Sequence, residues 1–115
     1  MATRSATITY APNGLRNCVQ VVWSGIATGD DGEAVSLDGY SDRSVQVEGT
    51  FGGASIAVHG SNDGSAFRAL NDVTKTAIAI TAAGIEQVLE MTRFVKPVCS
   101  GGAGSGITVT LFARR

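Results

Sequence analysis

A segment near the middle of the chain constrains the fold most. It combines the end of one predicted strand, a tight turn and an aromatic residue that begins the next predicted strand. It covers residues 59–67, with Asn62, Asp63 and Gly64 at its centre. Glycine adopts positive φ freely, and Asn and Asp side chains bond to their own backbone, so this is strong turn chemistry. Residues 44–51 and 54–59, just before it, alternate apolar and polar side chains with the period of a strand. The segment therefore indicates a β protein.

Short runs of the same kind recur along the chain, separated by Gly, Asn, Asp and Ser. The predicted strands are residues 6–10, 18–26, 34–37, 44–51, 54–61, 67–70, 77–81, 93–99 and 107–113. Short strands at this spacing predict an all-β chain, an antiparallel β-sandwich or jelly-roll-like fold. At 115 residues and 43% hydrophobic content, the chain has enough material for one modest core, so residues 1–115 are expected to form a single domain.

The alternation also assigns the two faces of the strands. The side chains expected in the core are Val45, Val47, Phe51, Ile56, Val58, Ile107, Val109 and Leu111. Between the two central runs, Gly52 and Gly53 predict a two-residue hairpin, because such a turn requires positive φ.

Residues 82–91 leave helix and strand open. Ile85, Val88 and Leu89 fit a helical stripe, whereas Ile85, Leu89 and Met91 fit one face of a strand. Gly84 disfavours a helix. We expect an extended segment or one helical turn.

The charge balance argues against some classes of partner. Nine basic and ten acidic side chains give a formal net charge of −1, unlike a protein that depends on nucleic-acid phosphates. No apolar run approaches the roughly 18 residues needed to cross a bilayer, and no secretory signal is recognisable. We therefore expect a chain made in the cytoplasm, with no direct nucleic-acid partner and no membrane partner. Residues 1–5 and 114–115 are expected to be flexible arms.

The two cysteines, Cys18 and Cys99, each lie in an apolar, strand-like run. They could meet across a sheet interface, but without a secretory signal two reduced thiols are the better expectation. With one histidine in the chain, neither a CxxC nor an HxxxH spacing for a metal is present.

The single histidine, His59, is the first candidate for proton transfer. Its neighbours Ser61 and Asp63 are equally well explained by turn formation. Nothing in the sequence pairs a nucleophile with a base and an orienting acid. We therefore expect a protein that is not an enzyme and needs no cofactor.

Two further motifs suggest ligands only superficially. Asp30, Asp31, Glu33 and Asp63 could offer oxygen ligands to calcium, but they lack the spacing of an EF-hand loop, and a solvated loop is favoured. Residues 101–106 are rich in glycine but lack the Lys-Ser/Thr ending of a phosphate-binding loop and precede a predicted strand. We expect a flexible hairpin loop there.

Aromatic and basic side chains offer two more surfaces. Trp23, Tyr40 and Phe67 could form a sugar-stacking platform, although Trp23 shares a strand face with valines and is expected in the core. Arg114 and Arg115, like Arg4 near the other end, add solubility or reach an acidic partner.

From Val47 onward, the order of turn and strand motifs resembles the head decoration, or cement, proteins of tailed bacteriophages. The motifs that carry the resemblance are residues 49–53, 58–70, 81–85, 91–97 and 100–102. Similar turns followed by an aromatic residue also occur in discoidin-like and carbohydrate-binding sandwiches, so the motifs support the sandwich fold as well.

The resemblance implies a virion structural protein on the outer surface of the expanded head. Its partner would be the major capsid protein, with self-association as a trimer, which is favoured, or a dimer. The expected contacts are the two arms and the loops 27–34 and 100–106. The residues singled out are Arg4, Asp30, Asp31, Gly102, Arg114 and Arg115. The alternatives are a glycan-binding module or another virion part, such as a head-completion, tail or fibre-associated sandwich.

Overall fold

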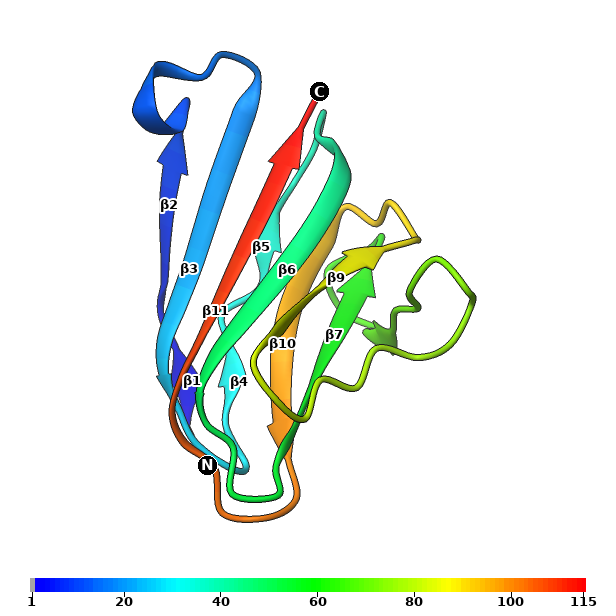
Figure 1. The fold of residues 1–115 in the computed structure, drawn as a ribbon. Helices are drawn as coiled ribbons and strands as arrows, with labels where there is room; N and C mark the ends of the chain where they lie inside the picture. The colour runs from blue at the N-terminus through cyan, green and yellow to red at the C-terminus, as the bar shows by residue number, and fades with distance from the viewer. Residues whose placement is uncertain (1) are drawn as a thin grey trace.

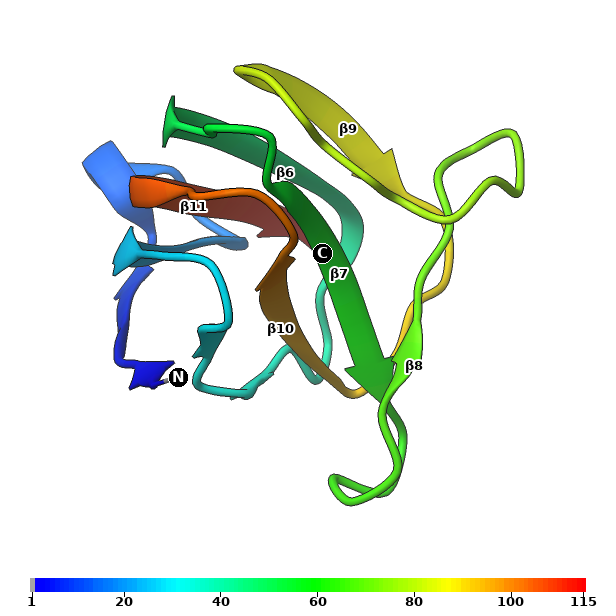
Figure 2. The same cartoon turned by 90° about the horizontal axis from the view of Figure 1, so that it is seen from below.

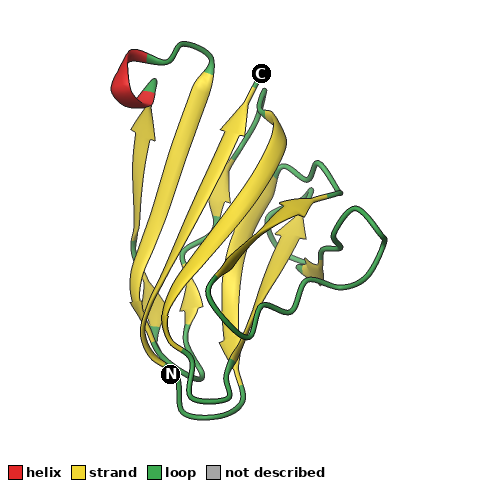
Figure 3. Ribbon diagram, viewed as in Figure 1, coloured by secondary structure: helices red, strands yellow, loops and turns green. Residues whose placement is uncertain are grey.

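The structure is a computed structural model that describes residues 2–115, and strands dominate it (Figures 1 and 3). The helical segment among these residues is η1 (Pro12–Gly14), a single 3₁₀ turn. The strands are β1 (Thr3–Arg4), β2 (Ala6–Tyr10), β3 (Cys18–Ile26), β4 (Asp31–Gly32), β5 (Val35–Ser36), β6 (Ser41–Thr50), β7 (Ser55–Ser61), β8 (Arg68–Ala69), β9 (Gly84–Val88), β10 (Phe94–Ser100) and β11 (Ser105–Arg114). Within residues 2–115, no helix has the length and apolarity to span a bilayer.

The described strands form two sheets that face each other across the core (Figure 2). Sheet A has the order β1-β4-β10-β7-β8, with β5 also pairing with β10, and sheet B has the order β2-β3-β11-β6-β9. Along the described strands, the chain changes sheet after β1, β3, β5, β6, β8, β9 and β10. The prediction of an all-β, jelly-roll-like sandwich is confirmed.

The core consists of the side chains that the alternation placed there. The six residues Val45, Val47, Ile56, Val58, Val109 and Leu111 are 0 to 2% exposed. Ile107 is also fully buried, and Phe51 packs against the core while remaining partly exposed. Trp23 lies at the centre, where its indole N–H donates to the carbonyl oxygen of Glu33 at 2.9 Å. The predicted faces are therefore confirmed.

Four segments differ from the predicted strands or were left open. Residues 82–91 contain a strand, β9, at the edge of sheet B, which confirms the extended alternative. Residues 77–81 make isolated bridges and no strand. The short strands β1 and β4 were not predicted, because two residues are too few to show alternation.

The predicted hairpin at Gly52 and Gly53 is wrong. β6 belongs to sheet B and β7 to sheet A, so the two glycines lie in an arch that crosses from one sheet to the other. The turn sequence encodes a reversal of the chain, but it does not encode which sheet the next strand joins. We call residues 51–54 the first arch.

The glycine-rich run that was expected to be a flexible hairpin loop is a second arch. Residues 101–104 connect β10 in sheet A to β11 in sheet B, beside the first arch at the lower end of Figure 1. The amide of Ala103 donates to the carbonyl oxygen of Gly52 at 2.9 Å. A Cβ atom on Gly102 would lie 2.4 Å from the carbonyl carbon of Gly53. Glycine is required because the two backbones touch.

Residues of the two arms expected at 1–5 and 114–115 pair with distant segments of the chain. β1 pairs in parallel with β4, and Arg114 pairs with Ser41 and Cys18 as the last residue of β11. The amide of Arg115 donates to the carbonyl oxygen of Asn17 at 2.9 Å. Backbone pairing to distant segments holds both ends, which local composition does not encode. Met1 lies outside the described residues.

Both cysteines are free, in agreement with the prediction. Cys18 is half-buried at the start of β3 in sheet B, whereas Cys99 is buried in β10 of sheet A. Burial raises the pKa of the Cys99 thiol, which keeps it protonated and unreactive.

We predict that Val47→Ala lowers the free energy of unfolding by about 2 kcal/mol, because it removes buried methyl groups and leaves a cavity. Val47 is 0% exposed, whereas Val73 is 57% exposed and serves as the matched control. Val73→Ala is expected to change stability by less than about 0.5 kcal/mol. Urea denaturation of the two variants and the parent chain measures the difference. Equal losses would contradict the assigned core.

A second prediction concerns the contact between the arches. Gly102 and Gly106 have similar backbone angles, φ +54 and φ +58, but a Cβ at Gly106 meets nothing within 4 Å. Alanine is strained at positive φ in both variants. The difference between their free energies of unfolding therefore isolates the clash with Gly53. We expect Gly102→Ala to be about 2 kcal/mol less stable than Gly106→Ala. Equal urea midpoints for Gly102→Ala and Gly106→Ala would contradict a tight backbone contact between the two arches.

Candidate functional site

The first cluster of predicted site residues lies where the N-terminal segment meets the loop 27–34. Asp30 is 4% exposed, and its carboxylate accepts hydrogen bonds from the Ala2 amide at 2.9 Å, the Arg4 Nε at 2.8 Å and the Ala27 amide at 3.0 Å. The Ala27 amide and the Arg4 side chain hold the pKa of Asp30 below its ordinary value. Arg4 and Asp30 are thus brought together in an internal ion pair. We call this arrangement the N-terminal clamp.

The other acidic side chains of this loop also bind neighbours. Asp31 accepts from the hydroxyl of Thr3 at 2.8 Å and from the ammonium of Lys96 at 3.0 Å. Glu33 accepts from the amide of Ala6 at 2.8 Å. The loop was expected to be solvated, but its carboxylates fix the entry of the chain into sheets A and B. No group of three His, Cys, Asp or Glu side chains suited to a metal occurs within residues 2–115.

His59, Ser61 and Asp63 do not form a relay in the structure. The Ser61 hydroxyl donates to the Asp63 carboxylate at 2.8 Å, and the same carboxylate oxygen accepts from the amides of Ser65 and Ala66. The two amides and this hydroxyl lower the pKa of Asp63 to about 2. His59 is half-buried, and burial together with the positive charge of Lys96 lowers its pKa. Ser61 and Asp63 therefore shape a turn.

The predicted contact residues divide between the two ends of the molecule (Figure 1). Gly102 lies at the end that carries the clamp, where the Thr28 hydroxyl donates to the Gly101 carbonyl oxygen at 2.7 Å and accepts from the Gly104 amide. Arg114 lies at the opposite end, where its Nε is 3.2 Å from Asp42 in an exposed ion pair. Arg115 lies there too. One flat contact cannot include all six residues.

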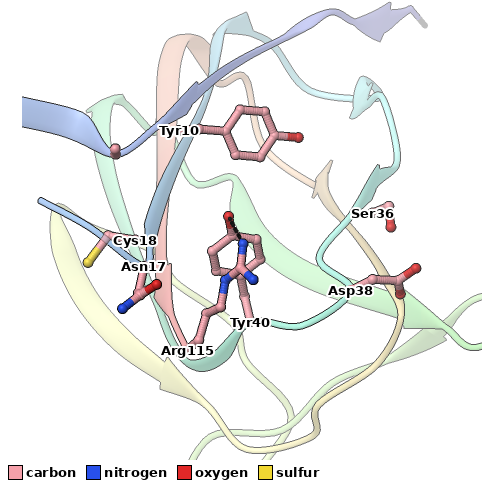
Figure 4. A pocket seen from close by; sticks show the side chains of 8 residues that line it. Tyr10, Asn17, Cys18, Ser36, Asp38, Tyr40 and Arg115 are labelled. Carbon is pink, nitrogen blue, oxygen red and sulfur yellow. Dashed lines mark hydrogen bonds between the residues drawn. The ribbon is translucent and has the colours of Figure 1, made fainter. Parts of the chain in front are cut away.

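An open cavity of about 580 Å³ lies at the end of the sandwich that carries the C-terminus (Figure 4). Its lining residues are Tyr10, Ala11, Asn17, Cys18, Ser36, Asp38, Tyr40 and Arg115. We call it the tyrosine pocket. Tyr10 pairs in register with the buried Val19, so it lies on the core-facing side of sheet B. It is nevertheless 64% exposed, because β2 is the edge strand of the sheet.

Tyr40 forms the opposite part of the pocket together with Arg115. The guanidinium of Arg115 lies 4.8 Å from the centre of the Tyr40 ring and donates to its hydroxyl at 3.3 Å. Figure 4 shows the two side chains together, with Tyr10 across from them. The sequence named Tyr40 and Arg115 separately but did not pair them, and it did not single out Tyr10.

Buried Arg43 positions the loop that carries Asp38 and Tyr40. Arg43 is 2% exposed, and its Nη2 donates to the carbonyl oxygens of Leu37 at 3.3 Å and Tyr40 at 3.1 Å. Among the described residues its Nη1 has no partner. Burial lowers the pKa of this guanidinium. Sequence reasoning missed Arg43, although the alternation that placed Val45 and Val47 in the core also places Arg43 on that face.

The sugar-stacking platform suggested by the sequence is not formed. Trp23 is fully buried between the sheets, and Phe67 packs under the ammonium of Lys96 at 4.7 Å, on sheet A. Tyr40 alone of the three lines the tyrosine pocket.

The outer face of sheet B carries two rows of uncharged side chains, one residue from each strand. On β3, β6 and β11 these side chains point away from the core because they alternate with buried neighbours, and the residues of β2 and β9 lie in register with them. In register, the first row is Thr9, Gln20, Phe112, Ser44 and Gln87, and the second is Thr7, Val22, Thr110, Gln46 and Ile85. We call them the neutral face. None of the 19 charged side chains of the sequence lies among these ten neighbouring positions.

Comparison with known proteins identifies a fold and no family. No protein-family model matches the chain, and no curated protein matches it in sequence. Among solved structures, the SPBc2 prophage-derived protein YomS superposes with a TM-score of 0.65 at 10% sequence identity, covering 85% of this chain and 95% of that one. At this identity the likeness shows a shared fold.

Other solved structures align more loosely. KdgF from a Halomonas species gives a TM-score of 0.41 at 11% identity, covering 96% of this chain and 79% of that one. An RmlC-like cupin protein from Desulfovibrio desulfuricans gives 0.44 at 8% identity, with coverages of 95% and 79%.

We predict that Asp30→Asn destabilises the protein at neutral pH, and that the difference from the parent chain disappears in acid. The folded pKa of Asp30 is lowered, so its stabilisation is complete above the unfolded value of about 3.9 and is lost as pH falls through the folded pKa. Urea denaturation between pH 7 and pH 2 measures this. Asp42→Asn, which removes an exposed ion pair, is the control and should change stability little at pH 7.

A constant difference between Asp30→Asn and the parent chain across this pH range would contradict the clamp. Amide hydrogen exchange gives an independent measurement. The amide of Glu33, which donates to the carbonyl oxygen of Arg4, should exchange faster in Asp30→Asn and unchanged in Asp42→Asn.

Proposed function

We propose that this protein is a non-enzymatic virion structural protein, a decoration or cement protein that binds the outer surface of an expanded phage head. The observation that carries the proposal is the neutral face, since the centres of protein interfaces are depleted of charge. The prophage origin of YomS, whose fold this chain shares, supports a phage setting. The resemblance of the motifs after Val47 to decoration proteins supports the same setting.

The neutral face suits repeated contact between flat surfaces. It crosses all five strands of sheet B, and Phe112, Val22 and Ile85 add apolar area among the hydroxyl and amide groups. Charged side chains border it at Glu48 and Arg114, near the ends of β6 and β11. Covering such a surface costs less solvation free energy than covering charged side chains, provided that its hydroxyl and amide groups find hydrogen-bond partners across the contact. We propose that copies of the chain associate through it, with a trimer favoured.

Cement activity then follows from mass action. A protein that binds the expanded shell better than its dissociated subunits stabilises the shell, and the stabilisation grows with the logarithm of its free concentration once this exceeds the dissociation constant. Many identical weak contacts add through multivalency, so no single tight site is needed. Arg114 and Arg115 remain predicted contacts with the major capsid protein. Their contribution to attachment is expected to weaken as salt rises.

We predict that Thr110→Arg abolishes self-association and weakens binding to expanded heads, because it places a charge at the centre of the neutral face. Thr81→Arg, an exposed substitution in a loop, is the matched control and should behave as the parent chain. Sedimentation velocity measures association, and cosedimentation with purified expanded heads measures attachment. Urea denaturation verifies that both variants are folded.

Heads lacking the protein should release their DNA at a lower temperature than heads saturated with it. If the parent chain neither cosediments with heads nor raises this temperature, the cement proposal is wrong. If Thr110→Arg associates and binds as the parent chain does, the neutral face is not the contact. Attachment to tails or fibres in place of heads would favour another virion part.

A further inference from the structure

The outer edge of β2 lacks the features that usually keep a strand edge from pairing. Within residues 2–115, β2 pairs with β3 on one side and with no strand on the other (Figure 1). Its five residues, Ala6–Tyr10, contain no charge and no proline, and Thr, Ile and Tyr favour strands. An uncharged edge with free backbone groups is a template for another strand.

The other sheet edges in this part of the chain are protected. β1, β5 and β8 contain two residues each, too few to offer a ladder. In β9, Glu86 lies in register with the buried Val45, so it brings a charge to the core-facing side of that edge. The equivalent positions of β2 are Ile8 and Tyr10, which lie in register with buried valines of β3, and both side chains are exposed. β2 therefore presents apolar surface where β9 presents a charge.

The ladder between β2 and β3 shows which backbone groups face this open edge. The Ala11 amide donates to the Cys18 carbonyl oxygen at 2.9 Å, and hydrogen-bonded pairs alternate along an antiparallel ladder. Thr9 and Thr7 therefore bond to β3 through their backbones. The amide and carbonyl groups of the residues on either side of each threonine point to the open edge.

One of these edge-facing amides is already occupied. Glu33 accepts a hydrogen bond from the Ala6 amide at 2.8 Å, which agrees with the direction assigned to this row. The amides and carbonyls of Ile8 and Tyr10 are left for a partner strand. A partner strand must therefore bond to these two residues and leave Ala6 with Glu33.

We propose that β2 of one copy pairs antiparallel with β2 of a second copy, about a two-fold axis at Thr9. In this register Ile8 lies opposite Tyr10 of the second copy, and each such pair exchanges two backbone hydrogen bonds. Both free amides then meet carbonyl oxygens, and the bond between Ala6 and Glu33 is kept. The strand complements itself, as an isologous contact requires, and no like charges meet. The Ile8 and Tyr10 side chains form cross-strand pairs on the core-facing side.

The pairing joins the two sheets B into one continuous sheet, and Thr9, which begins a row of the neutral face, meets Thr9 of the second copy. A contact between two five-residue strands is smaller than the roughly 1,200–2,000 Å² buried in a standard interface. We therefore expect a dissociation constant of about 1 mM, so that sedimentation at micromolar concentration measures association through the neutral face. The pairing becomes important where copies are held close together. The proposal does not rest on the cement function.

Disulfide trapping tests this register directly. In a Cys18→Ser background, where the remaining Cys99 is buried, Thr9→Cys places a thiol on the two-fold axis. Opposite residues of this non-hydrogen-bonded type have Cα atoms about 4.5 Å apart, within the range that a disulfide bridges. Thr7→Cys, exposed on the same strand, is the matched control, because the two Thr7 residues would lie roughly 13 Å apart along the strands.

Both variants are oxidised with copper phenanthroline in air at about 1 mM protein, near the expected dissociation constant. Non-reducing gels measure the dimers, and Thr9→Cys should crosslink about tenfold faster than Thr7→Cys.

A charge on the edge should prevent the pairing. Ile8→Lys should abolish the Thr9→Cys crosslink, because it brings a charge to the contact from each copy. Val73→Lys, which replaces another exposed apolar side chain in a turn, should leave the crosslink unchanged. Urea denaturation verifies that all variants are folded.

Equal or faster crosslinking of Thr7→Cys overturns the proposal, as does an Ile8→Lys variant that crosslinks like its parent. The Thr9→Cys crosslink should persist when Thr110→Arg disrupts the neutral face. Its loss there would show that the neutral face brings the copies together, and the edge contact would be rejected.

Discussion

The contact between the two arches is the constraint on which the rest of the structure depends. β6 and β11 are neighbours in sheet B, and β7 and β10 are neighbours in sheet A, so both arches must cross between the sheets side by side. They can do so only where backbone meets backbone, as Gly102 meets Gly53 and the Gly52 carbonyl meets the Ala103 amide. Glycine is also required at Gly49 in β6, since a Cβ there would lie 2.6 Å from the Cα of Ile107 in β11. These contacts fix the spacing of the sheets and hence the width of the core.

The N-terminal clamp closes the same end of the sandwich by electrostatic means. Asp30 replaces lost hydration with three hydrogen bonds, one of them from a guanidinium, so its burial is compensated. The clamp brings β1 beside β4, and Glu33 caps the first amide of the edge strand β2. Side chains that cover an open edge also block unwanted strand pairing. The basic and acidic residues that the sequence offered as partner contacts thus serve the fold first.

The alternation of apolar and polar residues predicted which face of each strand is buried. It could not predict features that depend on contacts between segments far apart in the sequence. The faces of Val45, Val47 and Val109 followed from period two, since neighbouring side chains in a strand must point in opposite directions. The crossing at Gly52 could not be predicted, because a turn sequence specifies no partner strand. The Arg4–Asp30 pair spans 26 positions, and β4 has only two residues. Tyr10 has the parity of a core residue, but its ring is exposed because β2 is the edge strand of sheet B.

The two ends of the sandwich consequently have different chemistry. At the closed end, the Asp30 carboxylate and the glycine backbones of the arches find hydrogen-bond partners within the chain, whereas at the open end Tyr10 of the tyrosine pocket faces solvent. Because the pocket and the neutral face lie on opposite sides of sheet B, contact through the face leaves the pocket accessible.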